Sequence, residues 1–497
     1  MYRLTDSPDP TPENFKFPVT QQLSPENRWV MLAALIPWSE YEGEYQKNFS
    51  PKMGAPAHPF RTALGALIIK EKLGTSDRET VEQIRENPYL QYFLGFSNYR
   101  NEAPFEASMF VHFRKRINIE LINQINQKII EQGIAQQDEG TAKKKEESEK
   151  PTLRGQLILD ATCAPGDISY PYDLKLLEHC RKQTEKIIDC LHRQPERPSQ
   201  DKPRTYRKKA RKEYLKVARQ RRPSRQARAD AIQKQLQYIQ RNLGYIDQYI
   251  ASGVSLTCLN PVQYKNLLVV SEIYRQQQQM WATQTYRIDD RIVSLTQPHI
   301  RPIVRGKAGK PVEFGAKLSV SCFDNYIYIH RLSWDNFNES VDLQAQVEHY
   351  KDLTGYYPSS VHVDKIYRTR ENRAWCKERG IRISGPPLGR PPKNVSPEDR
   401  KQAQLDERIR NTIEGKFGQA KRRYGLSRIL TKLRETSETA IAISFLVVNL
   451  STLLRQVYCL FLSFFLGKWK RGVYRLVRII QRVNKLLLNL CIYTPAF

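Results

Sequence analysis

Three carboxylates in this sequence stand in settings that suit metal-dependent phosphoryl chemistry. Asp160 follows the apolar run "LIL" and Asp364 follows "VHV". We expect each to end a buried strand, where an ionised side chain is costly unless it is paired or metal-bound. Glu414 is the one acidic residue in the basic segment from Arg410 to Leu426. Because carboxylates from separate elements can hold two Mg²⁺ ions for phosphoryl transfer, we predict Asp160, Asp364 and Glu414 as catalytic residues and ligands of two Mg²⁺ ions, for which Mn²⁺ can substitute.

Each of these carboxylates also has an ordinary structural interpretation. An Asp that ends a strand in a turn is common, and a lone Glu on a basic helix can simply be solvated. Arg410 precedes Glu414 by four residues and Lys421 follows it by seven, so the three fall near one face of a helix. On that face the Glu414 carboxylate could bind metal while Arg410 and Lys421 bind phosphates. We therefore predict Arg410 and Lys421, together with Lys317 on an expected strand, as DNA contacts.

The charge of the chain indicates a polyanionic partner. The formal net charge is +28, which makes nucleic acid the first candidate and an anionic membrane surface the second, ahead of a merely basic protein. Between Lys202 and Arg228, Lys and Arg dominate and Glu213 is the one acidic residue. So dense a run would repel itself without counterions, so we favour phosphate contact over a solvated helix face. The DNA-binding residues predicted here are Arg207, Lys208, Lys209, Arg211 and Lys212.

Cysteine usage and hydropathy favour a reduced, non-membrane setting. The eight Cys include no CxxC pair, and the segment His179–His192 lacks the spacing of a zinc motif. The polar, proline-rich start has no signal-peptide core. The apolar stretch 440–467 is interrupted by Arg455 and Gln456, which leaves pieces shorter than the roughly 20 residues of a spanning helix. We expect a buried core helix followed by an amphipathic tail, in a cytosolic protein.

The pattern along the chain predicts an α/β protein with several units. The segment after "RTALGALIIKEKL" offers Gly74 as a helix C-cap, and Ser76 with Glu79 offers a capping box. These short helices suit either a helix-turn-helix-like DNA-binding unit or a plain bundle with a basic face. The expected units are a flexible tail (1–25), a helical N-terminal DNA-binding domain (26–135), a linker (136–152), a catalytic domain (153–455) interrupted by a basic helical insertion (173–292), and an apolar and basic helical tail (456–497).

Strand and helix signals within the catalytic domain predict a mixed sheet. A strand from Gln156 precedes the insertion, and antiparallel strands turning at Asp324-Asn325 follow it. A helix ending at a Gly, a strand ending at Asp364, a helix, a further strand and a long helix capped by Ser396 come next. This order predicts a three-stranded antiparallel meander, then crossover helices to further strands, with helices on the faces of the sheet.

At these residues the sequence resembles bacterial insertion-sequence transposases that carry a DDE catalytic domain. The matching segments are "LILDATCAP", "SVHVDKIYRTRENRAWCKERGIRI" and "RNTIEGKFGQAKRRYGL". The last fits the family's Arg-x3-Glu-x6-Lys signature through Arg410, Glu414 and Lys421. The segments "GTSDRETVEQIRENPYLQYFLGF" and "MFVHFRKR" look like the N-terminal domain of these transposases. The resemblance implies an RNase H-like catalytic domain.

The resemblance also implies a reaction and partners. The reaction is Mg²⁺-dependent cleavage of DNA at transposon terminal inverted repeats and transfer of the freed 3′-OH to target DNA. Double-stranded DNA and a second copy of the chain would be the partners, in the bacterial cytoplasm beside the nucleoid. The alternatives are a catalytically inactive or domesticated DNA-binding protein, and an RNase H-like nuclease without strand transfer.

Two features depart from the family pattern. Glu407 stands where the signature usually has a Tyr, three residues before Arg410. About 200 residues separate Asp160 from Asp364, far more than an RNase H-like core requires. We interpret the excess as an inserted helical DNA-binding module.

Overall fold

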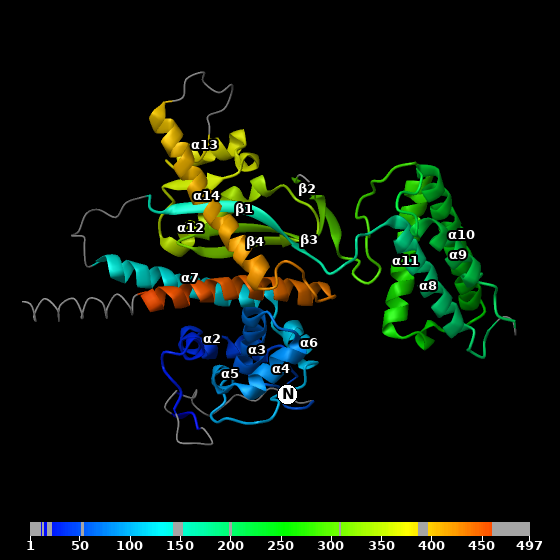
Figure 1. The fold of residues 1–497 in the computed structure, drawn as a ribbon, viewed down its shortest axis with the longest axis horizontal. Helices are drawn as coiled ribbons and strands as arrows, with labels where there is room; N and C mark the ends of the chain where they lie inside the picture. Colours follow the sequence, from blue (N-terminus) through cyan, green and yellow to red (C-terminus); the bar gives the residue numbers. More distant parts are fainter. Residues whose placement is uncertain are drawn as a thin grey trace, which may run out of the picture.

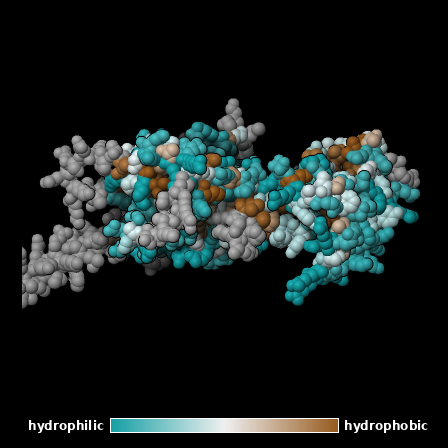
Figure 2. All heavy atoms as spheres, turned by 90° about the horizontal axis from the view of Figure 1, so that it is seen from above, coloured by the Kyte–Doolittle hydropathy of each residue, from teal (hydrophilic) through white to brown (hydrophobic). Residues whose placement is uncertain are grey.

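The computed structural model describes residues 11, 14–16, 22–50, 54–142, 153–197, 201–307, 310–385 and 396–459. These residues form a main body, in which a sheet lies over a set of N-terminal helices, and a separate helical bundle to one side (Figure 1). Viewed from above, much of the visible surface of both bodies is hydrophilic (Figure 2). The architecture is α/β with an added helical unit, as the sequence predicted.

The N-terminal helices pack around α3, which is buried along most of its length. Their bounds are α1 Arg28–Leu35, α2 Trp38–Gln46, α3 Phe60–Leu73, α4 Asp77–Glu86, α5 Pro88–Phe93, α6 Met109–Arg116 and α7 Ile119–Ala142. Helix α3 ends at Gly74, whose φ of 69° suits a glycine C-cap. Ser76 caps α4 by accepting from the Glu79 N–H at 3.2 Å. The predicted capping box is only half formed, because the Glu79 side chain accepts from Gln83 instead.

Two expected boundaries of this region differ in the structure. The predicted tail 1–25 is anchored where it is described: Phe15 is 3 % exposed and packs edge-on against Tyr92, with ring centroids 6.1 Å apart. The predicted linker begins inside a helix, because α7 continues through Ala142. In the first case, the contact of Phe15 with the distant Tyr92 outweighs the polar local composition. The rest of the linker, 143–152, lies outside the described residues.

The described residues of the main body form a six-stranded mixed sheet. The strand order is β2-β3-β1-β5-β6, and β4 also pairs with β3. Strand β1 is antiparallel to β3 and parallel to β5, while β3 is antiparallel to β4. The strands are β1 Gln156–Pro165, β2 Arg301–Lys307, β3 Lys310–Phe323, β4 Tyr326–Ser333, β5 Ser360–Val363 and β6 Arg382–Ile383. The predicted meander (β1, β3, β4) and the crossovers to β5 and β6 are confirmed.

Local turn and cap signals in this part of the chain are also confirmed. Asp324 and Asn325 have φ of 48° and 67°, the left-handed pair that a two-residue hairpin turn requires. Helix α12 (Leu343–Thr354) ends at Gly355. Helix α14 (Pro397–Arg423) begins after Ser396, whose hydroxyl accepts from the Asp399 N–H. The remaining described elements here are the short helices η3 Glu339–Asp342 and η4 Lys365–Tyr367 and the helix α13 Arg370–Glu378.

The helix Arg434–Cys459 joins the sheet to the N-terminal helices. It runs beside α7 beneath the sheet (Figure 1). Its fully buried Asn449 bonds the Ile327 N–H at 2.9 Å, the Ile327 carbonyl at 2.7 Å and the Asn126 side chain at 2.8 Å. Three segments far apart in sequence are thereby tied into one hydrophobic core. Residues 460–497, the greater part of the predicted tail, lie outside the described residues.

By length and composition alone, Arg434–Cys459 could cross a membrane. In this structure 83 % of its most apolar window is buried inside the protein. Its side chains therefore serve the core that the sheet and the N-terminal helices share, as the sequence predicted.

The insertion forms a helical bundle with its own cores. Its helices are α8 Asp173–Leu191, α9 Arg207–Ala218, α10 Arg225–Ala251 and α11 Pro261–Ala282, with the short helix η2 Leu256–Cys258. Two apolar clusters, centred on α8, α10 and α11, fill its interior. The chain enters the bundle after β1 and returns to the sheet before β2. The bundle lies beside the main body (Figure 1).

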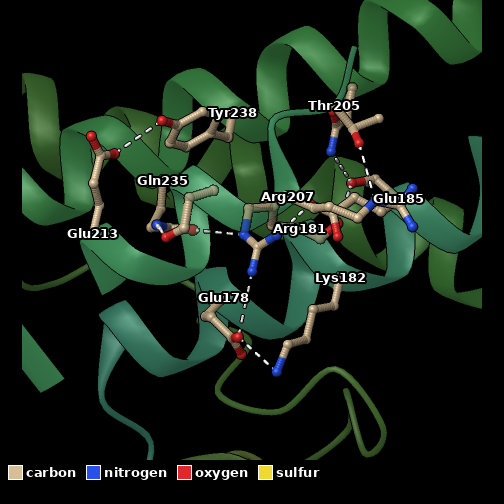
Figure 3. A network of polar contacts seen from close by, with 12 residues as sticks. Glu178, Arg181, Lys182, Glu185, Thr205, Arg207, Glu213, Gln235 and Tyr238 are labelled. Carbon is tan, nitrogen blue, oxygen red and sulfur yellow. Dashed lines mark hydrogen bonds and ion pairs between the residues drawn. The ribbon is translucent and has the colours of Figure 1, made fainter. Parts of the chain in front are cut away.

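A buried ion network crosses the bundle at Arg181, which is 1 % exposed. Its guanidinium contacts Glu185 one turn along α8, reaches Glu178 at 3.4 Å and donates to Gln235 of α10 at 3.1 Å (Figure 3). Burial raises the pKa of Glu185, although Arg181 opposes that effect. The guanidinium therefore compensates the buried Glu185, whereas Glu178 also has Lys182 as a partner at 2.7 Å.

We expect Arg181→Met to destabilise the bundle by about 3–5 kcal/mol at pH 7, because it leaves the buried Glu185 carboxylate without its partner. The raised pKa of Glu185 means that its contribution to stability is full below about pH 4.3. That contribution is lost as the pH rises through the folded-state value. The deficit of the variant should therefore shrink as the pH falls toward 4, in melts followed by circular dichroism. Adding Glu185→Gln should restore part of the loss at pH 7, and a failure to do so would contradict this account.

Candidate active site

Asp160 lies in the middle of β1, not at its end. The strand continues to Pro165 because its second half pairs with β3, as far as Pro165 opposite Gly315. The strand-end prediction was therefore wrong for this residue. Alternation along β1 places Asp160 on the same face of the sheet as Ile158 and on the opposite face from Leu159.

The parallel register of β5 brings Asp364 beside Asp160. Leu159 is the partner of Val363, so the next positions on the two chains are neighbours, and adjacent strands lie about 4.8 Å apart. Asp364 directly follows β5, as predicted, and its carboxylate caps η4 by accepting from the Lys365 N–H at 2.6 Å. The register thus joins two carboxylates that are about 200 residues apart in sequence.

Helix α14 is fastened across the same face of the sheet through Asp406. Arg382 of β6 donates two hydrogen bonds to the Asp406 carboxylate, at 2.9 and 2.8 Å. The ring Nδ1 of His362, which shares the face of Asp160, lies 3.6 Å from the same carboxylate. Burial opposes ionisation of Asp406, but the Arg382 and Gln402 bonds hold its pKa below the usual value. Burial also lowers the pKa of His362, so a neutral ring is favoured there.

A cavity marks which side of α14 faces the start of β1. It has a volume of about 530 Å³ and opens between α14, the β3–β4 turn and the beginning of β1. Ile409 and Thr412 of α14 line it together with Gly155 and Gln156. This flank of α14 lies next to the buried row that packs on the sheet, formed by Ile413, Phe417 and Ala420.

Glu414 lies on the opposite flank of α14 with Arg410 and Lys421. Since the cavity flank faces the start of β1, we expect this flank to face the later residues of β1, where Asp160 lies. The Glu414 side chain is 53 % exposed, and its carboxylate accepts from Arg410 at 3.1 Å. Glu407, which the sequence left unexplained, lies 3.9 Å from the other side of the same guanidinium. Arg410 is thus shared by two acidic side chains of its own helix.

The carboxylates fit a metal only in part. Carboxylate oxygens are the ligands that Mg²⁺ prefers, and Asp160 and Asp364 supply them from adjacent positions. Within the described part of the chain, however, no group of three or more His, Cys, Asp or Glu side chains could together hold a metal ion. The structure therefore places Asp160 and Asp364 at neighbouring register positions and leaves Glu414 paired with Arg410 on α14.

Two polar side chains that were not predicted from the sequence, Tyr367 and Glu339, belong to the surroundings of Asp160. Tyr367 of η4 is fully buried, and burial, followed by the charges of Asp160 and Glu339, raises its pKa well above the ordinary value. The ammonium of Lys317 contacts Glu339 and donates to the Phe337 carbonyl at 2.6 Å. Lys317 is 8 % exposed, and Glu339 balances the charge of Lys317 inside the domain. The role of Lys317 as a DNA contact stays a prediction. Only the folded structure reveals that Tyr367 and Glu339 lie near Asp160, because no local sequence pattern links these residues.

The predicted cations of the insertion fall into two groups. Lys208, Lys209, Arg211 and Lys212 are exposed on α9. Arg207 instead donates to both oxygens of Asp189 on α8, at 3.1 and 2.8 Å. Its charge is partly neutralised by the bundle itself, whereas the four neighbours on α9 form no ion pair with a described carboxylate.

Comparisons with known proteins indicate the family of the chain. Residues 361–451 match the family described as "Transposase DDE domain", and residues 17–116 match "Transposase domain (DUF772)". A curated protein of Rhizobium meliloti, an uncharacterised protein called ORF8 in the nfe locus, is 31% identical over 154 residues, which are 31% of this chain and 69% of that protein. The chain belongs to the insertion-sequence transposases.

The matched parts of this transposase include some of the candidate residues and not others. Asp364 and Glu414 fall within the DDE match, whereas Asp160 and the helical insertion lie outside both matched segments. No solved structure matches the chain. Transposases act on DNA, so the general class is a DNA-processing enzyme, and divalent metals are the usual cofactors of its DDE members.

We expect Asp406→Asn to loosen α14 over the sheet. The lowered pKa of Asp406 means that its ion pair stabilises the fold above about pH 3.9 and is lost as the pH falls through the folded-state value. The variant should therefore lose about 1–3 kcal/mol at pH 7, and the loss should shrink as the pH is lowered below about 3.9, in thermal melts at pH 7 and at acidic pH. The exposed neighbour Glu407→Gln is the control and should change little. An equal loss at both pH values would refute the ion-pair account.

Proposed function

We propose that this transposase is a DDE enzyme with an RNase H-like catalytic domain. In this proposal it cleaves DNA at transposon terminal inverted repeats and transfers the 3′-OH ends into target DNA. The observation that carries the proposal is the parallel register of β1 and β5, which makes neighbours of Asp160 and Asp364 beneath the helix that bears Glu414. The strand order, with an antiparallel meander followed by parallel crossovers, supports the RNase H-like assignment.

Asp160, Asp364 and Glu414 are the proposed holders of two Mg²⁺ ions. When bound, these ions would activate a water or a 3′-hydroxyl and stabilise the leaving oxygen. Arg410 keeps the Glu414 carboxylate extended along the flank of α14. Once Glu414 turns toward the two Asp, the guanidinium of Arg410 is released to a DNA phosphate. Lys421, two turns further along this flank, would hold a second phosphate.

The DNA partner is proposed to contact the protein in several places. The exposed cations of α9 supply phosphate contacts on the bundle, and the N-terminal helices supply a further DNA-binding unit for the inverted repeats. Because two ends must be brought together, a second copy of the chain is the proposed protein partner. We propose the bacterial cytoplasm, beside the nucleoid, as the location, and no membrane partner.

We expect Asp160→Asn, Asp364→Asn and Glu414→Gln each to abolish cleavage of end-sequence DNA with Mg²⁺ and to leave DNA binding intact. The reason is that an amide cannot replace an anionic ligand of a hard cation. Nicking assays and electrophoretic mobility shifts on the same preparations measure the two properties. Glu407→Gln serves as the control, because it removes a charge from the same helix outside the proposed ligand set.

Two outcomes would support other functions. Wild-type protein that nicks no more than Asp160→Asn would indicate a DNA-binding protein without catalysis. Cleavage without joining of a pre-cut 3′-OH end to a plasmid would indicate a nuclease. Loss of binding together with activity in the three variants would mean that these carboxylates are needed for folding.

We expect the exposed cations of α9 to set part of the salt dependence of DNA binding. Each phosphate contact contributes about 0.9 to the slope of log K against log salt concentration. Replacing Lys208, Lys209, Arg211 and Lys212 with Gln should lower that slope by roughly two to four. Arg207→Gln is the matched comparison and should change the slope little, because Asp189 already holds that guanidinium. Fluorescence anisotropy over a salt series measures both, and an unchanged slope in the fourfold variant would remove α9 from the interface.

A further inference from the structure

Two largely buried lysines from different units of the main body bond to adjacent residues of the helix Arg434–Cys459. Lys72, in the last turn of α3, donates to the Ser451 hydroxyl at 3.0 Å. Lys416 of α14 is 7 % exposed and donates to the Thr452 hydroxyl at 2.9 Å. Both hydroxyls belong to the helix Arg434–Cys459. The helix Arg434–Cys459 therefore accepts a hydrogen bond from one lysine of the N-terminal helices and from one lysine of α14.

Arg455 lies near both lysines, and Arg28 lies near Lys72. Burial, together with the nearby charges of Arg28 and Arg455, lowers the pKa of Lys72 to about 8. Burial also lowers the pKa of Lys416 to about 8, with Arg455 acting in the same direction. Among the residues that the structure describes, no carboxylate forms an ion pair with any of these four cations. We call Arg28, Lys72, Lys416 and Arg455 the junction cluster.

Such a cluster is costly unless something offsets it. Burying an ammonium without a counterion is unfavourable, and neighbouring like charges increase the cost. A hydroxyl partner provides a hydrogen bond and no opposite charge. By contrast, the buried Arg114 of α6 has the carboxylate of Asp77 as its partner. The junction cluster therefore has the electrostatics of an anion site.

The surroundings favour DNA as the source of the anion. Helix α14 ends beside the cluster: its exposed Arg422 and Arg423 lie in its last turn, and α3 ends at Gly74 near the Arg423 carbonyl. Tyr424, directly after α14, is tied to Ser451 through their hydroxyls at 3.1 Å. Cations thus continue from the Lys421 end of α14 to the junction. A row of cations fits successive backbone phosphates better than one small anion.

We propose that Lys72 and Arg455, flanked by Arg28 and backed by Lys416, bind a phosphate of duplex DNA that passes from α14 across the junction of the two units. This inference rests on the proposed action on DNA, and it adds a contact outside the carboxylate site, the α9 surface and the Arg410–Lys421 flank. Since Lys72 and Arg455 come from different units of the main body, the contact exists only when those units are docked.

The test measures DNA binding in EDTA, so that cleavage plays no part. We expect the double variant Lys72→Met, Arg455→Gln to lower the slope of log K against log salt concentration by about one, equally for end-sequence and unrelated DNA. Lys377→Gln, at an exposed position of α13 far from the junction, is the control and should leave the slope unchanged. Lys72→Met alone should keep or raise the melting temperature, because it removes an uncompensated buried charge.

Three results would overturn the inference. The first is a slope equal to that of the wild type in the double variant. The second is a lower melting temperature with an unchanged slope, which would mean that Lys72 only holds α3 to the helix Arg434–Cys459. The third is stabilisation of the wild type by millimolar inorganic phosphate with no effect of the variants on DNA binding, which would indicate a small-anion site.

The outcome is separable from that of the proposed function. A wild type that cleaves nothing, yet shows the slope difference, would refute the DDE activity and support the junction site. A wild type that cleaves and joins, with equal slopes in both proteins, would support the DDE activity and refute the junction site.

Discussion

The parallel pairing of β1 with β5 is the constraint on which the proposed chemistry depends. Its register makes neighbours of Asp160 and Asp364, and a slip of one residue would turn one of them to the other face of the sheet. The pairing survives an insertion of more than a hundred residues, because the insertion closes its own cores away from the sheet. β3 then returns antiparallel to β1 and restores the sheet that β5 joins.

The large positive charge of the chain is divided between structural and available cations. Arg114 and Arg181 are buried against carboxylates, and Arg207 is tied to Asp189. Such cations add to the net charge and offer little to a partner. The exposed face of α9, the flank of α14 and the junction cluster carry the cations that we propose for DNA. Among the described residues no carboxylate forms an ion pair with the α9 group or the junction cluster, whereas Arg410 on the flank of α14 is paired with Glu414. A polyanion that touched all three would follow both bodies of the protein.

Helix α14 connects stability with the proposed function. Its first half is fastened to the sheet by Arg382 and His362 through Asp406, and its buried Lys416 meets the helix that docks the N-terminal unit. Glu414 lies between these two attachments, on a flank that stays exposed. The position of the third carboxylate is therefore set by contacts to elements on either side of it, and a change in the ion pair with Arg410 would be enough to redirect it.

The sequence by itself determined the features that depend on neighbours along the chain. The caps at Gly74, Ser396 and Gly355 and the hairpin turn at Asp324-Asn325 are of this kind, because backbone conformation and nearby hydrogen bonds decide them. The candidate carboxylates were found from the same local signals. Tertiary structure decided what those signals could not: Asp160 lies within its strand because β3 extends the pairing, and Lys317 is balanced by Glu339. Partners brought together from far along the chain determine such features, and no pattern within a few residues encodes them.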